Sequence, residues 1–169
     1  MADNSLTILH HLRGISGAKE TVGLDDETIA RFCGSDAQLV QAINEAGEAH
    51  KRLIEEFGMD VMALPESELI PHLQKDYVNF YAPATVNPYI PIAGRGPLLV
   101  TSSGAVLHDN GGYGMLGSGH GPDSIIKAMS QNWVMANVMT PSFSQKRLGE
   151  RLRKELGHAR GHCPFDRFI

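Results

Sequence analysis

The spacing of apolar positions along residues 1–75 predicts a helical segment with one long amphipathic helix. Within residues 35–57, side chains suited to burial recur at steps of three and four, namely Leu39, Ile43, Ala46, His50, Leu53, Ile54 and Phe57. This period places them in one stripe, so one face of the helix must be covered by other parts of the protein. Ser35 and Gln38 have capping-box spacing at its start, and Gly58 suits a left-handed residue at its end.

Weaker periodicity predicts three further helices, over residues 5–13, 26–33 and 65–74. Asp25 is placed to cap the second of these, and Pro65 suits the first turn of the third. Pro71 lies inside the third helix and is expected to kink or shorten it. His50 interrupts the apolar stripe of the long helix, and we expect a partly buried histidine with one hydrogen-bond partner rather than a ligand-binding one.

Residues 76–97 form a stretch dense in proline that holds three of the four tyrosines. Closely spaced prolines forbid a helix and favour an extended connection over a surface. Two short apolar runs follow, over residues 98–101 and 105–109, and the Ser102-Ser103-Gly104 turn between them predicts an antiparallel hairpin.

Two helices are expected after the hairpin. Pro122 and Asp123 open the first, which runs to about Trp133, and Ser142 with Gln145 repeats the capping-box spacing at the start of the second. The predicted fold is therefore α+β. It divides into a helical extension (1–75), an extended connector (76–97) and a hairpin-plus-helix segment (98–169).

Composition and charge exclude several classes of protein. A hydrophobic content of 42% with 20% charged residues is typical of a folded domain rather than a disordered chain. The net charge of −4, with scattered Lys and Arg, gives no nucleic-acid footprint. No apolar run approaches the roughly 18 residues that span a bilayer. The unpaired spacing of Cys33 and Cys163 fits a reducing cytoplasm.

Residue chemistry alone names no reaction. The cluster GSGHGPDS, which begins at Gly117, is compatible with anion binding, but it matches neither dinucleotide nor phosphate-loop spacing. The alternative is a tight strand-to-helix turn, in which His120 bonds backbone. His158, His162 and Cys163 have ligand chemistry but lack a fourth member, so no metal site is predicted.

A family resemblance emerges between Leu98 and Asn132, in LLVTSSGAVLHDNGGYGMLGSGHGPDSIIKAMSQN. This stretch resembles the amino-terminal entry of class III, fold-type I aminotransferases, which depend on pyridoxal phosphate. Gly104 and Asp109 match the family's hairpin, and Gly119-His120, one of Ile125 and Ile126, and Ala128 match the motif that follows it. Pro122 comes slightly early for that motif. The likeness extends over about residues 76–169.

The resemblance implies a parent enzyme that transfers an amino group between an amino donor and a keto acid. Tyr113, with Gly114 and Met115, matches the family's substrate-binding positions. The family's Ser-Gly-x-Glu-Ala phosphate turn, its ring-binding Asp and its Schiff-base lysine have no counterpart here. The chain contains six lysines, Lys19, Lys51, Lys75, Lys127, Lys146 and Lys154, and none matches that position.

We therefore expect an amino-terminal portion of such an enzyme that ends before the cofactor domain. It would have no catalytic residue of its own and no covalently bound pyridoxal phosphate. Because the family dimerises through this region, the resemblance implies a homo-oligomer or a full-length subunit as partner. The alternative is a stand-alone interaction module that docks on a full-length aminotransferase subunit.

Overall fold

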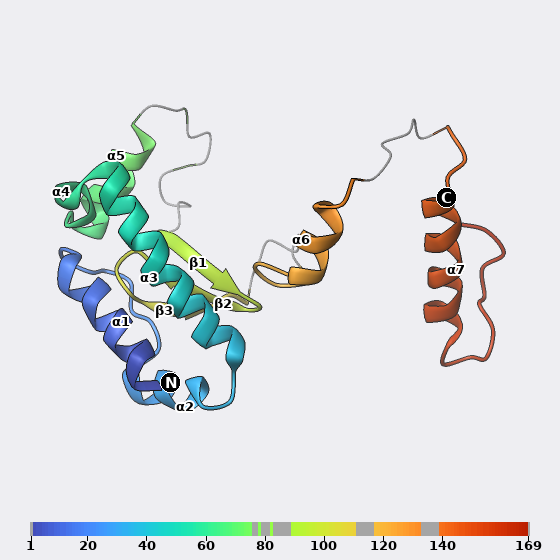
Figure 1. Ribbon diagram of the computed structural model, residues 1–169, viewed down its shortest axis with the longest axis horizontal. Helices are drawn as coiled ribbons and strands as arrows, with labels where there is room; N and C mark the ends of the chain where they lie inside the picture. Colours follow the sequence, from blue (N-terminus) through green and yellow to red (C-terminus); the bar gives the residue numbers. More distant parts are fainter. Residues whose placement is uncertain are drawn as a thin grey trace. The chain divides into compact units, whose positions relative to one another are not determined.

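The structure is a computed structural model that describes residues 2–75, 78, 82, 89–110, 117–132 and 139–168. Its helices in these ranges are α1 (Ala2–Ile15), α2 (Asp26–Cys33), α3 (Ala37–Phe57), α4 (Met59–Met62), α5 (Glu66–Gln74), α6 (Asp123–Met129) and α7 (Phe143–Gly157). Its strands are β1 (Pro91–Arg95), β2 (Leu98–Thr101) and β3 (Val106–His108), which form one antiparallel sheet in that order (Figure 1). The predicted α+β class is confirmed. The chain divides into two compact units, Met1–Met129 and Ser130–Ile169.

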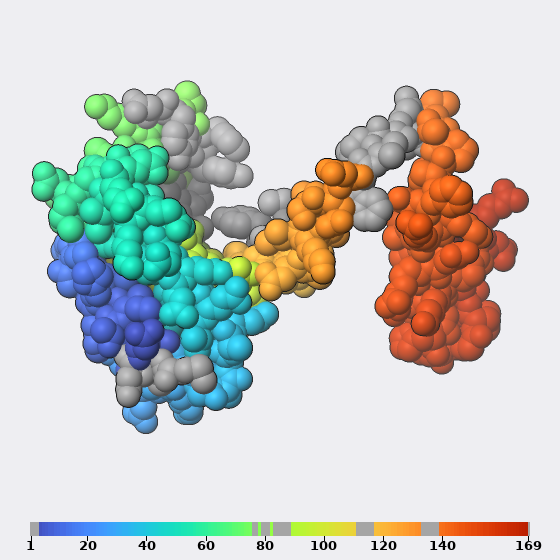
Figure 2. Space-filling model, viewed as in Figure 1, coloured from blue at the N-terminus to red at the C-terminus, as the bar shows by residue number. Residues whose placement is uncertain are grey.

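The long helix α3 organises the first unit. It packs against α1, β1 and β2. The first part of the predicted apolar stripe, from Leu39 to His50, is buried on this side, whereas Phe57 at its end is exposed. Leu39, Ile43 and Ala46 are fully buried there. In Figure 2, the side chains of α1 (blue) and α3 (teal) lie next to each other on the surface of this unit. Burial of each large aliphatic side chain contributes about 1.5 to 3 kcal/mol, so the stripe is a main source of stability.

The start of α3 differs from the prediction by one residue. Asp36, not Ser35, is the N-cap, and its carboxylate accepts hydrogen bonds from the backbone N–H groups of Gln38 and Leu39. The Ser35 hydroxyl instead donates to the Phe32 carbonyl at the end of α2. An ionised carboxylate is the stronger acceptor for the positive end of a helix, which explains the outcome. Gly58 has the positive φ expected of it, at 91°.

His50 was expected to be partly buried with one partner, and this was wrong. Its side chain lies on the core face of α3 with 1% exposed, and its Nε2 atom has no hydrogen-bond partner among the described residues. Burial, and secondarily the nearby His11, lowers the pKa of His50 below its ordinary value. At neutral pH the folded protein therefore favours the neutral form of this imidazole.

We expect His50→Leu to make the stability of the protein less dependent on pH. In the unfolded chain the imidazole takes up a proton below about pH 6.5, whereas the lowered pKa delays this in the folded state. Stability should therefore fall as the pH drops from about 6.5 toward the folded pKa. Urea unfolding at neutral and mildly acidic pH measures this difference. His72→Gln, which removes an exposed histidine of α5, is the control. If His50→Leu kept the pH dependence of the wild type, the interpretation would be contradicted.

The hairpin was predicted correctly, but the sheet has one more strand. Leu98 pairs with His108 and Val100 with Val106, and Gly104 in the turn has φ of 73°. The additional strand β1 lies within the predicted connector and pairs with β2. Its proline is the first residue of the strand, where a missing N–H costs no ladder hydrogen bond.

The loop between α1 and α2 is fastened to the rest of the first unit by Glu66, the first residue of α5. The Glu66 carboxylate is 1% exposed and accepts hydrogen bonds from the backbone N–H groups of Glu20 and Thr21, each at 2.7 Å. The Ser103 hydroxyl, in the hairpin turn, donates to it at 2.5 Å. Further along the loop, the Leu24 N–H donates to the Val106 carbonyl of β3 at 2.8 Å. One buried carboxylate thus joins the loop, α5 and the hairpin.

The second unit is built on α7. The predicted capping box is confirmed, because the Ser142 hydroxyl accepts from the Gln145 N–H and the Gln145 side chain accepts from the Ser142 N–H. After the helix the chain returns along it, and the Arg153 guanidinium donates to the carbonyl oxygens of Phe165 and Asp166. Within the described ranges, no helix is long and apolar enough to cross a membrane.

Candidate functional site

The predicted substrate-binding residues Tyr113, Gly114 and Met115 lie outside the described residues. The structure does describe both flanks of residues 111–116, which are the end of β3 and the turn that leads to α6. The candidate site is therefore built from these flanks and from the strands that hold them.

Asp109 and His120 meet across these flanks. The His120 Nε2 atom lies 2.8 Å from Asp109 Oδ2, and the two side chains are 25% and 17% exposed. The backbone of His120 also bridges to Gly96, with N–O distances of 2.7 and 3.0 Å. The Asp109 N–H donates to the Pro97 carbonyl at 2.7 Å. His120 was expected to bond backbone through its side chain. Its ring instead pairs with a carboxylate, and its own backbone makes the bridge.

Gly119 must be glycine for this bridge to form. Its φ is 75°, and a Cβ atom placed there would lie 2.7 Å from backbone atoms of Gly96. Gly117, two residues earlier, has nothing within 4 Å of such an atom. The prediction of a tight turn is confirmed at Gly119, which combines a left-handed conformation with close backbone approach.

Arg95 connects this turn to the long helix. From the end of β1, its guanidinium contacts both Glu45 oxygens of α3, at 2.6 to 3.2 Å, and Asp123 of α6 at 2.6 Å. It also donates to the Gly121 carbonyl at 2.6 Å. The hydrogen bonds with Glu45, and then those with Asp123, raise the pKa of Arg95. The reciprocal bond from Arg95 lowers the pKa of the Glu45 carboxyl. These contacts of Arg95 with Glu45, Gly121 and Asp123, called the Arg95 clamp below, hold the turn against α3 and β1.

We expect Arg95→Ala to lower the free energy of unfolding by more than the loss of a single exposed ion pair, because its guanidinium contacts two carboxylates and one backbone carbonyl. Arg95→Lys should lie between wild type and alanine, since an ammonium cannot reproduce the planar fork. Urea unfolding followed by circular dichroism measures both. Arg151→Ala is the matched control, because it removes only an exposed pair with Glu155, worth about 0.5 kcal/mol or less. Equal losses for the Arg95 and Arg151 alanine variants would contradict this role.

A polar cavity of about 380 Å³ lies beside the turn. Asp109, Ser118 and His120 line it, together with Gln38 and the backbone of Gly96 and Gly119. These groups suit a small polar ligand or substrate group. None of the described residues that line it is a lysine, so they do not fit covalent attachment of pyridoxal phosphate.

The remaining candidate chemistry does not gather into a site. In the part of the chain that the structure describes, no group of three His, Cys, Asp or Glu side chains is placed to hold a metal ion. His158 Nδ1 lies 2.7 Å from the Glu155 carbonyl oxygen, and both cysteines are free thiols.

Sequence reasoning missed Arg95 and Glu66. Arg95 lies within the predicted extended connector, and Glu66 within the predicted helix over residues 65–74, and neither was singled out. The one signal for Glu66 was its place directly after Pro65, where a carboxylate complements the helix dipole.

Comparison of the chain with protein families, curated proteins and solved structures finds no match.

Proposed function

We propose that this chain is the amino-terminal part of a class III aminotransferase-like protein, in which it frames the entrance to the substrate site. The supporting observation is that the two ends of residues 110–118 are fixed at one place. Asp109 and His120, both on positions of the family motif, bond to each other, and the Gly96 bridge and the Arg95 clamp hold the turn. A rigid frame around a short segment suits a substrate-contacting segment, because catalysis demands precise positioning.

In this proposal the residues of this chain position the substrate and do not take part in the bond-breaking steps. The parent reaction is amino-group transfer, and pyridoxal phosphate supplies that chemistry when it is bound. The residues of this chain would shape the polar cavity, orient the substrate carboxylate near Tyr113 and exclude water. The Schiff-base lysine would come from a later part of the parent enzyme.

The decisive experiment is to read the coding sequence and the transcript downstream of the codon for Ile169. The proposal expects an in-frame continuation that begins with a Ser-Gly-x-Glu-Ala turn and contains a later cofactor lysine. For the chain alone, borohydride treatment with pyridoxal phosphate and peptide mapping should give no stoichiometric adduct at a single lysine. A terminated transcript, or a specific lysine adduct with turnover, would contradict the proposal.

A second candidate, an interaction module that docks on a full-length aminotransferase subunit, is favoured by one observation. In the second unit, apolar side chains of α7 are uncovered in this chain, with Phe143 83%, Leu148 60% and Leu156 45% exposed. Exposed large apolar side chains are available for contact with a partner. Size-exclusion chromatography with light scattering separates the candidates. A monomer with a cooperative thermal transition favours the module, whereas aggregation of the chain alone favours a part of a larger enzyme.

A further inference from the structure

A second cavity, of about 390 Å³, lies in the first unit and has no part in the function proposed above. It is bounded by the C-terminal half of α3, the α4–α5 segment and the start of β1. Its wall is mainly apolar and includes Leu53, Phe57, Met62, Leu69 and Ile92. Volumes of about 300 to 1,000 Å³, with apolar walls and few polar groups, are typical of small-molecule sites.

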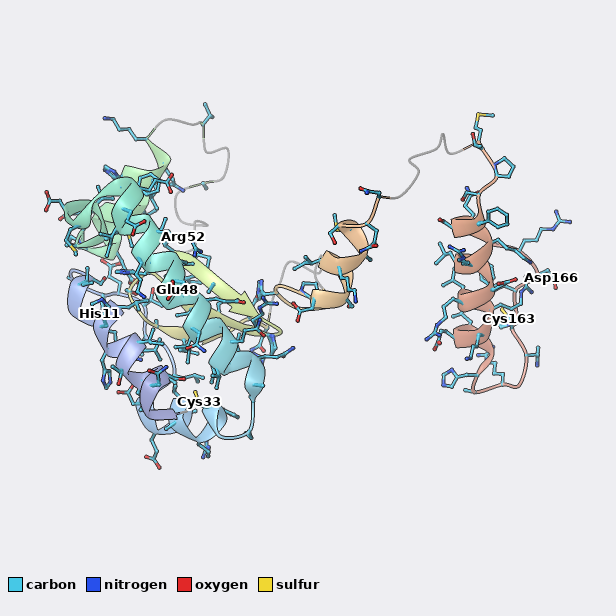
Figure 3. All side chains as sticks on the ribbon, viewed as in Figure 1. His11, Cys33, Glu48, Arg52, Cys163 and Asp166 are labelled. Carbon is cyan, nitrogen blue, oxygen red and sulfur yellow. The ribbon has the colours of Figure 1, made fainter. Side chains whose placement is uncertain are left out.

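Among the described residues that line this cavity, the charged ones are one cation and one anion. Arg52, labelled on α3 in Figure 3, and Glu56 both line it and are exposed to solvent. They are four residues apart and so lie one above the other on the same face, with Cβ atoms about 5 to 6 Å apart. Within the described part of the chain, neither side chain forms a hydrogen bond or ion pair. On α7 the same spacing gives closed pairs, Lys146–Glu150 and Arg151–Glu155.

Arg52 and Glu56 thus place one cation and one anion, each without a partner in the described part of the chain, one helical turn apart at the edge of an apolar cavity. This arrangement matches the chemistry of a zwitterion with an apolar side chain. The planar Arg52 guanidinium is shaped to bind a carboxylate through two hydrogen bonds. The Glu56 carboxylate is an acceptor for an ammonium group. We propose that this cavity binds a free apolar α-amino acid, such as leucine or phenylalanine, with its side chain among the apolar wall residues.

The charges of the first unit argue against simpler ligands. Residues 1–129 carry eight Lys and Arg against sixteen Asp and Glu, so a fatty acid would meet Glu56 and a negative surrounding field. An apolar amine, which carries a positive charge, would be repelled by the Arg52 guanidinium. A zwitterion satisfies both groups and carries no net charge. This proposal does not rest on the aminotransferase assignment.

The test is isothermal titration calorimetry of the full chain with leucine and with phenylalanine. We expect saturable binding of one molecule per chain. Three analogues each remove one recognised feature: glycine lacks the apolar side chain, isocaproate lacks the amino group and isoamylamine lacks the carboxylate. Each should bind about tenfold more weakly or not at all, because each loses a charged contact or the apolar burial.

Two variants connect the binding to the named residues. Arg52→Gln and Glu56→Gln should each weaken leucine binding by about tenfold, whereas Glu55→Gln, an adjacent acid that does not line the cavity, should leave it unchanged. Both variants change exposed side chains, and circular dichroism confirms that the fold is kept. Absence of binding by either amino acid, equal affinity for isocaproate, or unchanged affinity in both variants would each overturn the proposal.

Discussion

Replacing Glu66 with alanine is expected to lower the free energy of unfolding by about 3 kcal/mol or more, since each hydrogen bond to a buried charged group contributes about 1.5 to 3 kcal/mol. The substitution leaves the N–H groups of Glu20 and Thr21 and the hydroxyl of Ser103 without their acceptor. Urea unfolding monitored by circular dichroism measures the loss.

Two companion variants separate the buried network from a general effect on α5. Glu68→Ala removes an exposed acid from the same first turn and should cost little. Glu66→Gln keeps the shape and one acceptor oxygen, so its loss should be intermediate. If Glu66→Ala and Glu68→Ala proved equally stable, the carboxylate would not be what holds the loop.

The same carboxylate should make the protein sensitive to acid. Burial alone would raise the pKa of Glu66, but the hydrogen bonds from Ser103, Thr21 and Glu20 outweigh it and lower the pKa. The stabilisation is present above the unfolded pKa of about 4.3 and is lost as the pH falls through the lower, folded value. Urea midpoints between neutral pH and about pH 3 should fall more steeply for wild type than for Glu66→Gln. Parallel curves would contradict this assignment.

Gly119→Ala is the second change with a large expected effect, about 2 kcal/mol or more. A left-handed backbone alone costs a residue with a Cβ atom about 1 to 2 kcal/mol. The new methyl carbon would also lie 2.7 Å from backbone atoms of Gly96, so the bridge from Gly96 to His120 must open. Urea unfolding measures the loss, and hydrogen exchange should show faster exchange at the Gly96 and His120 amides.

Gly117→Ala is the matched control for this experiment. It adds the same methyl group to the same turn, where nothing lies within 4 Å. It should change stability by about 0.5 kcal/mol or less, as surface substitutions usually do. Equal effects at the two glycines would show that the close approach at Gly119 is not what requires glycine.

Local sequence signals predicted the elements whose causes are local. The stripe of α3 follows from a 3.6-residue period, the hairpin from Gly104, and the start of α7 from the Ser142 capping box. Each depends on residues that lie close together in the chain, so a reading of short windows suffices.

The features that escaped prediction depend on partners distant in sequence. Strand β1 forms because β2 offers an edge, although prolines around it favour an irregular connection. Arg95 meets Glu45, which lies 50 residues earlier, and Glu66 meets Ser103, which lies 37 residues later. No local pattern distinguishes such charged residues from solvated ones. At the candidate site, Asp109 and His120 were placed in the motif, but their direct contact required the fold.

The loop held by Glu66 has a further consequence for the edge of the sheet. Its Leu24 N–H pairs with Val106 of β3, and Gly23 lies so close that a Cβ atom there would be 2.7 Å from the Val106 backbone. The loop therefore occupies an edge that would otherwise be open to pairing with a strand from another molecule. Release of the loop would expose this edge, so we expect loss of the Glu66 contacts to favour pairing of β3 with a strand of another molecule.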